Sequence, residues 1–360
     1  MQNEGQLKAH HAISARPDSP KSKLPFGLTG DRFTLYAAIL ASLVFTLVIW
    51  LVGQRLQDMP HLPYAGFGTY YWQLAGQTTL GKVSAWVLYV LHQLTLWGLI
   101  YYAKTRVHRF TSGLHRLNVV ALTANGLFIL LHLLQTHIWY DGLAPEVSYW
   151  SWLGFLFVAL VLILMMENGR RGMFFGKKAP LSRNVVNFVR RNHSYFIALA
   201  AAYTFWYHPM EPSYDHLSGF FYMFLILIQS SLMYTRIHFN KWWTIVLEVT
   251  VLFHTTMVAW YQGNDTWQMF AFGFAGVFVV TQLHGLGLSL RRRLPFFVVY
   301  AGMVWIVYLG RGWENLIEII RIPLFDYVAV FLFAWLIGGG LWLSRLATSK
   351  RQVAKSGTKT

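Results

Sequence analysis

The sequence predicts an all-α membrane protein, a polytopic bundle of about ten transmembrane helices with both termini on the cytoplasmic side. Three observations lead to this fold class. Of the 360 residues, 55% are hydrophobic and only 12% are charged, about half the charged fraction of soluble domains. Apolar stretches long enough to cross a bilayer recur along the chain. The basic residues alternate between successive loops in the pattern typical of membrane proteins.

Ten apolar stretches reach or approach the length of a membrane-spanning helix, which needs about 20 residues to cross a hydrocarbon core of about 30 Å. In chain order they are Phe33–Val52, Ser84–Ala103, Val119–Trp139, Tyr149–Met166, Ser194–His208, Leu217–Thr235, Trp242–Tyr261, Thr266–Leu286, Pro295–Leu309 and Leu324–Leu343. The fifth and ninth are short and need flanking residues to reach full length. The ten form one membrane domain over 33–345, between a disordered cytoplasmic tail over 1–32 and a basic cytoplasmic tail over 346–360.

The distribution of charge predicts the orientation of these spans. All but four of the 30 Lys and Arg fall in the tails and in the loops of one side, so that side is expected to be cytoplasmic. The exceptions are Arg55, Lys82, Arg311 and Arg321. The net charge of +16 therefore indicates topology in a bacterial inner membrane or an equivalent bilayer. It favours membrane lipids as partners, with an anionic component, and does not indicate nucleic acid. The chain has no Cys, which excludes disulfides and thiolate ligands.

Two loops are long enough to carry structure of their own. The outer loop Gly53–Val83 contains Pro60, Pro63 and several aromatic residues, and we expect it to form a re-entrant or interfacial lid. The inner loop Glu167–His193 is basic, and we expect it to lie as an amphipathic segment on the cytoplasmic surface.

The ionisable residues inside the predicted spans are nearly all histidines. Such residues are costly in lipid, and each is a functional candidate for that reason. The predicted orientation puts most of them in the middle or outer half of the membrane: His92, His132, His137, His208, His216 and His254. The simplest role for each is a hydrogen bond between helices. Glu248 is the one carboxylate well inside a span, and we expect it to pair with Lys241 or Thr244, with a proton relay as the alternative.

Three chemistries can use these groups. The first is general acid–base catalysis, in which His132 or His254 takes the proton of a hydroxyl acceptor during acyl transfer. The second is bis-histidine haem ligation, although no span carries two histidines at the spacing that a pair of haems needs. The third is a zinc or iron site within nine residues of the chain. Its candidate ligands are His208, Glu211, Asp215 and His216.

Several segments resemble the integral-membrane acyltransferases, that is, the acyltransferase-3 family and its distant Cas1p-like relatives. Those segments are His115–Asn118 leading to His132, Met173–Lys178, Phe188–Arg191, Phe272–Phe274 through Arg291–Pro295, Lys241–Trp243, His254 and Gln282–Gly285. The resemblance covers about half of the chain. It implies that His132 is the catalytic base and that Arg116, with the inner basic loops, guides an acyl-CoA-like donor.

The leading hypothesis is therefore transfer of an acyl group, such as acetyl, to a glycan or lipid-linked hydroxyl. In this hypothesis His132, His254 and Arg116 carry the reaction. The first alternative is a transporter or flippase for an envelope precursor. The second is a membrane redox subunit with b-type haem or quinone.

Overall fold

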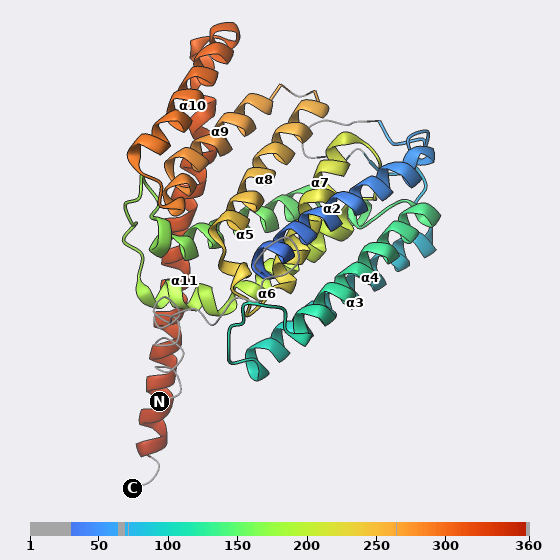
Figure 1. The fold of residues 1–360 in the computed structure, drawn as a ribbon. Helices are drawn as coiled ribbons and strands as arrows, with labels where there is room; N and C mark the ends of the chain where they lie inside the picture. Colours follow the sequence, from blue (N-terminus) through green and yellow to red (C-terminus); the bar gives the residue numbers. More distant parts are fainter. Residues whose placement is uncertain (1–29, 64–68, 71, 264, 358–360) are drawn as a thin grey trace.

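The computed structural model describes residues 30–63, 69–70, 72–263 and 265–357, and these contain ten α-helices (Figure 1). They are α2 (Gly30–Gly53), α3 (Thr79–Arg106), α4 (Arg116–Trp139), α5 (Tyr149–Arg171), α6 (Arg183–Tyr207), α7 (Tyr214–Ser231), α8 (Lys241–Tyr261), α9 (Trp267–Val280), α10 (Leu290–Arg311) and α11 (Glu318–Gly357). Each overlaps one of the ten predicted stretches, so the all-α fold class is confirmed. The predicted N-terminal tail lies outside the described residues up to residue 29.

Seven helical segments in the described ranges are long and apolar enough to cross a membrane. They are Phe33–Leu56, Thr79–Arg106, Arg116–Trp139, Tyr149–Arg171, Lys241–Tyr261, Trp267–Leu286 and Leu290–Arg311. Large apolar side chains are also exposed on the lateral surface of the bundle. Examples are Leu40, Trp335 and Leu336, which are 62%, 73% and 71% exposed. Because such continuous apolar faces are rare on proteins in water, the structure is that of a multi-pass membrane protein. The helices α6, α7 and α11 are not among the seven, so ten spans remain a prediction.

Two predicted boundaries differ from the structure. The inner loop Glu167–His193 is mostly helical, because α5 continues to Arg171 and α6 already begins at Arg183. The predicted start of the basic tail at residue 346 falls within α11, whose backbone stays helical to Gly357. Hydropathy marks where lipid ends, whereas polar residues such as Arg, Lys and Gln continue a helix into water at little cost.

In the bundle α7 packs against α2 and α8, and α5 packs against α6 and α11. In Figure 1, α3 and α4 lie side by side as an antiparallel pair, and α8, α9 and α10 follow one another on the other side of the bundle. α9 also packs against α11. A Cβ at Gly273 would lie 2.9 Å from Ile322, so only glycine allows this approach of the two helices.

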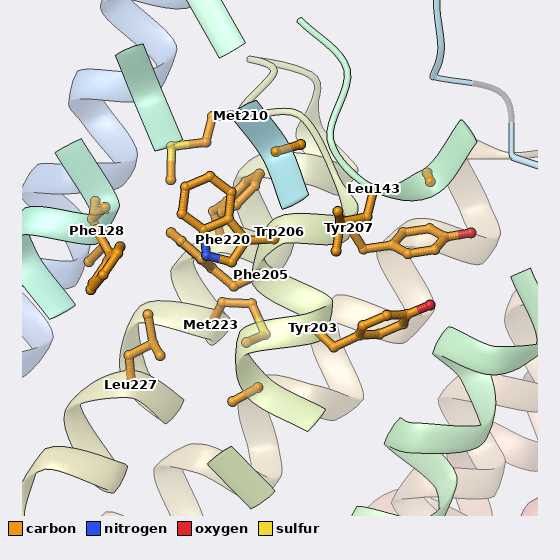
Figure 2. Packing of buried hydrophobic residues seen from close by; sticks show 14 of the residues in the cluster. Phe128, Leu143, Tyr203, Phe205, Trp206, Tyr207, Met210, Phe220, Met223 and Leu227 are labelled. Atoms are coloured by element: carbon orange, nitrogen blue, oxygen red, sulfur yellow. The ribbon is translucent and has the colours of Figure 1, made fainter. Parts of the chain in front are cut away.

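The C-terminal end of α6 is enclosed by aromatic side chains and by the connection between α4 and α5. Phe205, Trp206 and Phe220 lie together between α6 and α7 in Figure 2. The backbone N–H of Leu143 donates to the carbonyl of Trp206 at 2.9 Å. A Cβ at Gly142 would lie 2.4 Å from that carbonyl oxygen, so glycine is required there. This packing fixes the end of α6 against the connection between α4 and α5.

The C-terminal end of α9 is broken. The helix stops at Val280 and continues as the 3₁₀ helix η5 (Gln282–Leu286). At the break, the Thr281 hydroxyl lies 2.6 Å from the Met173 carbonyl and 2.7 Å from the Tyr327 hydroxyl. The N–H of Phe175 donates to the Val280 carbonyl at 2.8 Å. The connection between α5 and α6 is therefore docked against this break.

Candidate functional site

Polar side chains gather at both ends of the bundle. The outer side is defined here by the described connections 54–63, 69–70, 72–78, 140–148, 208–213, 262–263, 265–266 and 312–317. The inner side is defined by 107–115, 172–182, 232–240 and 287–289, and is the side that the charge pattern predicts as cytoplasmic.

A phenol lies between two imidazoles on the outer side. The Tyr70 hydroxyl is 2.9 Å from Nδ1 of His208 and 3.3 Å from Nε2 of His216. On its other nitrogen, Nδ1, His216 lies 2.8 Å from the Ser213 hydroxyl and 3.4 Å from an Asp215 carboxylate oxygen. These five residues form what we call the outer histidine cluster. They come from the loop before α3, the end of α6 and the start of α7.

The electrostatics of the outer histidine cluster keep its phenol protonated. Burial raises the pKa of Tyr70 well above its ordinary value of 10, and the nearby Tyr140, Tyr207 and acidic side chains raise it further. Its hydroxyl therefore donates to one imidazole nitrogen and accepts from the other. Trp72 contacts His216 edge-on with ring centroids 4.7 Å apart, so an aromatic ring shields this imidazole.

A second carboxylate–phenol–imidazole group lies beside the first. The buried Tyr140 hydroxyl donates to Glu211, and it also hydrogen-bonds Nε2 of His61. The His61 nitrogen is 3.7 Å from the same Glu211 oxygen. Tyr140 has a φ of 65°, which an L side chain adopts only under strain of about 1–3 kcal/mol. Such strain is typical of functional positions, and here it turns the phenol toward both partners.

The acid Asp141 follows directly and is also buried. One oxygen accepts from the backbone N–H of Leu74 at 3.1 Å, whereas the other has no partner among the described residues. Burial raises the pKa of Asp141 from its ordinary 3.8 to about 6, partly offset by the Leu74 hydrogen bond.

The predicted catalytic residue His132 lies away from any surface. Its ring is stacked on Trp206 with centroids 4.3 Å apart and meets Phe205 and Phe220 edge-on. It is fully buried, and neither ring nitrogen has a partner in the described ranges. A substrate hydroxyl could not reach it without moving these rings, so the geometry gives no support to a role as base.

The other predicted catalytic residues are dispersed. His254 on α8 is 3.0 Å from the Ser218 hydroxyl and packs against Gly219, beside the outer histidine cluster but not hydrogen-bonded to it. Arg116 is exposed at the start of α4. Sixteen residues of helix separate it from His132, or about 24 Å along the axis. The structure therefore does not bring Arg116 and His132 together.

The haem and metal hypotheses also find no supporting geometry. His92 accepts from the Trp206 indole and hydrogen-bonds Asn125, so both of its nitrogens are engaged. The four predicted metal ligands divide into two groups, with Glu211 on Tyr140 and the other three around Tyr70. In the part of the chain that the structure describes, no three His, Asp or Glu side chains are arranged to hold a metal ion.

Glu248 does not have the partner that the sequence predicts. It pairs with Arg171 of α5, while Lys241 donates instead to the Leu286 carbonyl at 2.8 Å. The expectation of a partner on its own helix was wrong, because the fold places Arg171 of α5 beside Glu248 and a full charge at this depth takes the nearest opposite charge.

Sequence reasoning missed three residues of the outer side as functional candidates: His61, Tyr70 and Tyr140. His61 and Tyr140 are 79 residues apart and meet only through the fold. The one signal for Tyr70 was its place in an aromatic-rich outer loop.

A comparison of the chain with protein-family models, curated proteins and solved structures finds no match. The fold and the site therefore define a class, an all-α multi-pass membrane protein with a buried histidine cluster at its outer side. They do not define a family.

Proposed function

We propose that this protein transfers an acyl group to a hydroxyl acceptor, a glycan or a lipid-linked sugar, at the outer side of the membrane. In this proposal His216, and not His132, is the general base. The donor is an acyl thioester of the acyl-CoA type.

The observation that carries this proposal is the Tyr70 hydroxyl at Nε2 of His216, an imidazole that is oriented through its other nitrogen. The Ser213 hydroxyl hydrogen-bonds Nδ1 of His216, and an Asp215 carboxylate oxygen lies 3.4 Å from the same nitrogen, which leaves Nε2 as the proton acceptor. That nitrogen faces the Tyr70 hydroxyl at 3.3 Å. A carboxylate that orients an imidazole, which in turn faces a hydroxyl, is the arrangement that activates oxygen nucleophiles in many enzymes. The phenol marks the position at which an acceptor hydroxyl would be bound.

The reaction balances with these groups alone. The acceptor hydroxyl gives its proton to Nε2 of His216, and its oxygen forms a bond to the thioester carbonyl carbon. The carbon–sulfur bond then breaks, and the thiolate takes the proton from His216. His208 offers a second imidazole nitrogen next to the same oxygen, at 2.9 Å from the Tyr70 hydroxyl.

Membrane vesicles that contain the protein test this directly. With acetyl-CoA labelled in its acetyl group, we expect label in the lipid or glycan fraction, and His216→Gln should lower the rate by roughly 10²–10⁴. The matched control is His137→Gln, because His137 is on the same side but bonds Arg55 outside the cluster. Unchanged labelling in His216→Gln membranes, with the protein present at normal level, would rule out His216 as the base.

One observation favours a second candidate, a proton-coupled transporter for an envelope precursor. Electrostatic interactions between neighbours connect five histidines in the bundle: His92, His132, His208, His216 and His254. The rings of His208 and His216 are 5.5 Å apart, and electrostatic interactions link His208 with His132 and His254. Rows of buried titratable groups are typical of proton relays. Flux into proteoliposomes that depends on a pH gradient and needs no acyl donor would favour this candidate over acyl transfer.

A further inference from the structure

Cationic side chains from three helices converge on three consecutive residues, His284–Leu286 of η5. Arg293 of α10 donates to the His284 imidazole, the first of the three. Arg170 of α5 faces the carbonyl of the second at 3.4 Å. Lys241 of α8 donates to the carbonyl of the third at 2.8 Å. The broken end of α9 is therefore the meeting point of positive charges that lie far apart in the sequence.

A fourth cation, Arg171, is buried under the same turn. Its side chain is 1% exposed, and its Nη1 pairs with Glu248. A Cβ at Gly285 would lie 3.2 Å from the Arg171 Cβ, so the glycine lets α5 pass closely beneath η5. The Nε and Nη2 atoms of Arg171 are buried and have no hydrogen-bond partner within the described residues. We call Arg170, Arg171, Lys241 and Arg293 the inner cation cluster.

The charge of the inner cation cluster is only partly balanced. Among the described residues, two carboxylates are paired with its four cations, Glu167 with Arg170 and Glu248 with Arg171. The η5 carbonyls and the His284 imidazole accept hydrogen bonds but carry no full negative charge. In a half-buried position of low dielectric, this excess of positive charge attracts an anion more strongly than it would in water.

The free atoms of Arg171 specify the shape of that anion. Nε and Nη2 form one edge of the planar guanidinium, the edge that binds two oxygens side by side. Phosphate groups and carboxylates both fit such an edge, but a phosphate has further oxygens for Lys241 and Arg293.

We propose that the inner cation cluster binds a phosphate-bearing anion from the inner side of the membrane. The site shares no residue with the outer histidine cluster, so this proposal is independent of acyl transfer. Thirteen residues of α8 separate Lys241 from His254, or about 20 Å. An acyl donor that binds by its phosphates here would therefore need an arm of about that length.

Thermal unfolding of the full chain tests binding and distinguishes two sources of phosphate. Protein in detergent without anionic lipid is titrated with inorganic pyrophosphate and, separately, with sodium chloride at equal ionic strength. A saturable rise in Tm with pyrophosphate, and none with sodium chloride, supports a soluble ligand. A rise only in nanodiscs that contain phosphatidic acid, compared with phosphatidylcholine, supports a lipid headgroup. No specific rise in either arm overturns the proposal.

Substitutions then locate the site. Arg293→Gln and Lys241→Gln should each weaken binding roughly tenfold or more, as expected for a lost hydrogen bond to a charged group. Because Arg171→Gln alone would leave a buried carboxylate unpaired, it is combined with Glu248→Gln, and this double variant should weaken binding roughly 100-fold. Arg106→Gln is the matched control, an equal charge change at an exposed position at the end of α3. Wild-type affinity in all three cluster variants would show that the anion binds elsewhere.

Discussion

The substitution Asp141→Asn gives the most direct test of the buried outer network. Asp141 is 1% exposed, and burial raises its pKa from 3.8 to about 6. Because this pKa is raised in the folded state, the protein is more stable at low pH. The full contribution is present below pH 3.8 and is lost as the pH rises to about 6. Two pKa units correspond to about 3 kcal/mol.

The Asn variant cannot ionise, so it should lose this pH dependence. We expect the free energy of unfolding of Asp141→Asn, relative to wild type, to rise by about 3 kcal/mol between pH 3 and pH 7. Any fixed cost of the new buried amide shifts the whole curve and leaves its slope unchanged. Denaturant unfolding of the detergent-solubilised protein across this pH range measures the difference.

A control of opposite sign is present on the same side of the membrane. Arg311 hydrogen-bonds Glu318 and holds the pKa of that carboxyl below its ordinary value, despite some burial. Glu318→Gln should therefore lose stability at neutral pH and regain wild-type behaviour as the pH falls through the folded-state pKa. Equal pH slopes for Asp141→Asn and wild type would refute the assignment of Asp141 as a buried, destabilising charge.

Three further predictions concern neighbouring residues and use thermal or denaturant unfolding. Tyr140→Phe should lower the free energy of unfolding by about 1–3 kcal/mol, because it removes the hydroxyl that hydrogen-bonds both Glu211 and His61. An unchanged Tm would contradict this network. His132→Phe should fold normally and keep any transferase activity. Trp206→Ala should lower the free energy of unfolding by about 3–5 kcal/mol. Loss of activity in a stably folded His132→Phe protein would restore His132 as a catalytic residue. Gly142→Ala should unfold more readily by at least about 1–3 kcal/mol, since its Cβ would overlap a carbonyl oxygen, and wild-type stability would contradict the packing at the end of α6.

The sequence by itself determined the fold class and the number and order of the helices. Each apolar stretch must bury its backbone polar groups in hydrogen bonds within itself, and a helix is the only local way to do so in lipid. That requirement depends on composition alone, so it can be read without knowledge of neighbours. The same reasoning singled out buried histidines and the segment from His208 to His216.

Only the tertiary structure decided which of these residues meet. The fold joins Tyr70 to His216 across 146 residues and Arg171 to Glu248 across 77, and neither pair has a signal in local spacing. It also encloses His132 in aromatic rings, although a histidine within an apolar helix has the same appearance in sequence whether it faces a substrate or a tryptophan. Partner choice depends on helix rotation and on close approaches such as the one at Gly285, and these arise from packing over the whole bundle. For this reason helix content follows from hydropathy, whereas the outer histidine cluster and the inner cation cluster do not.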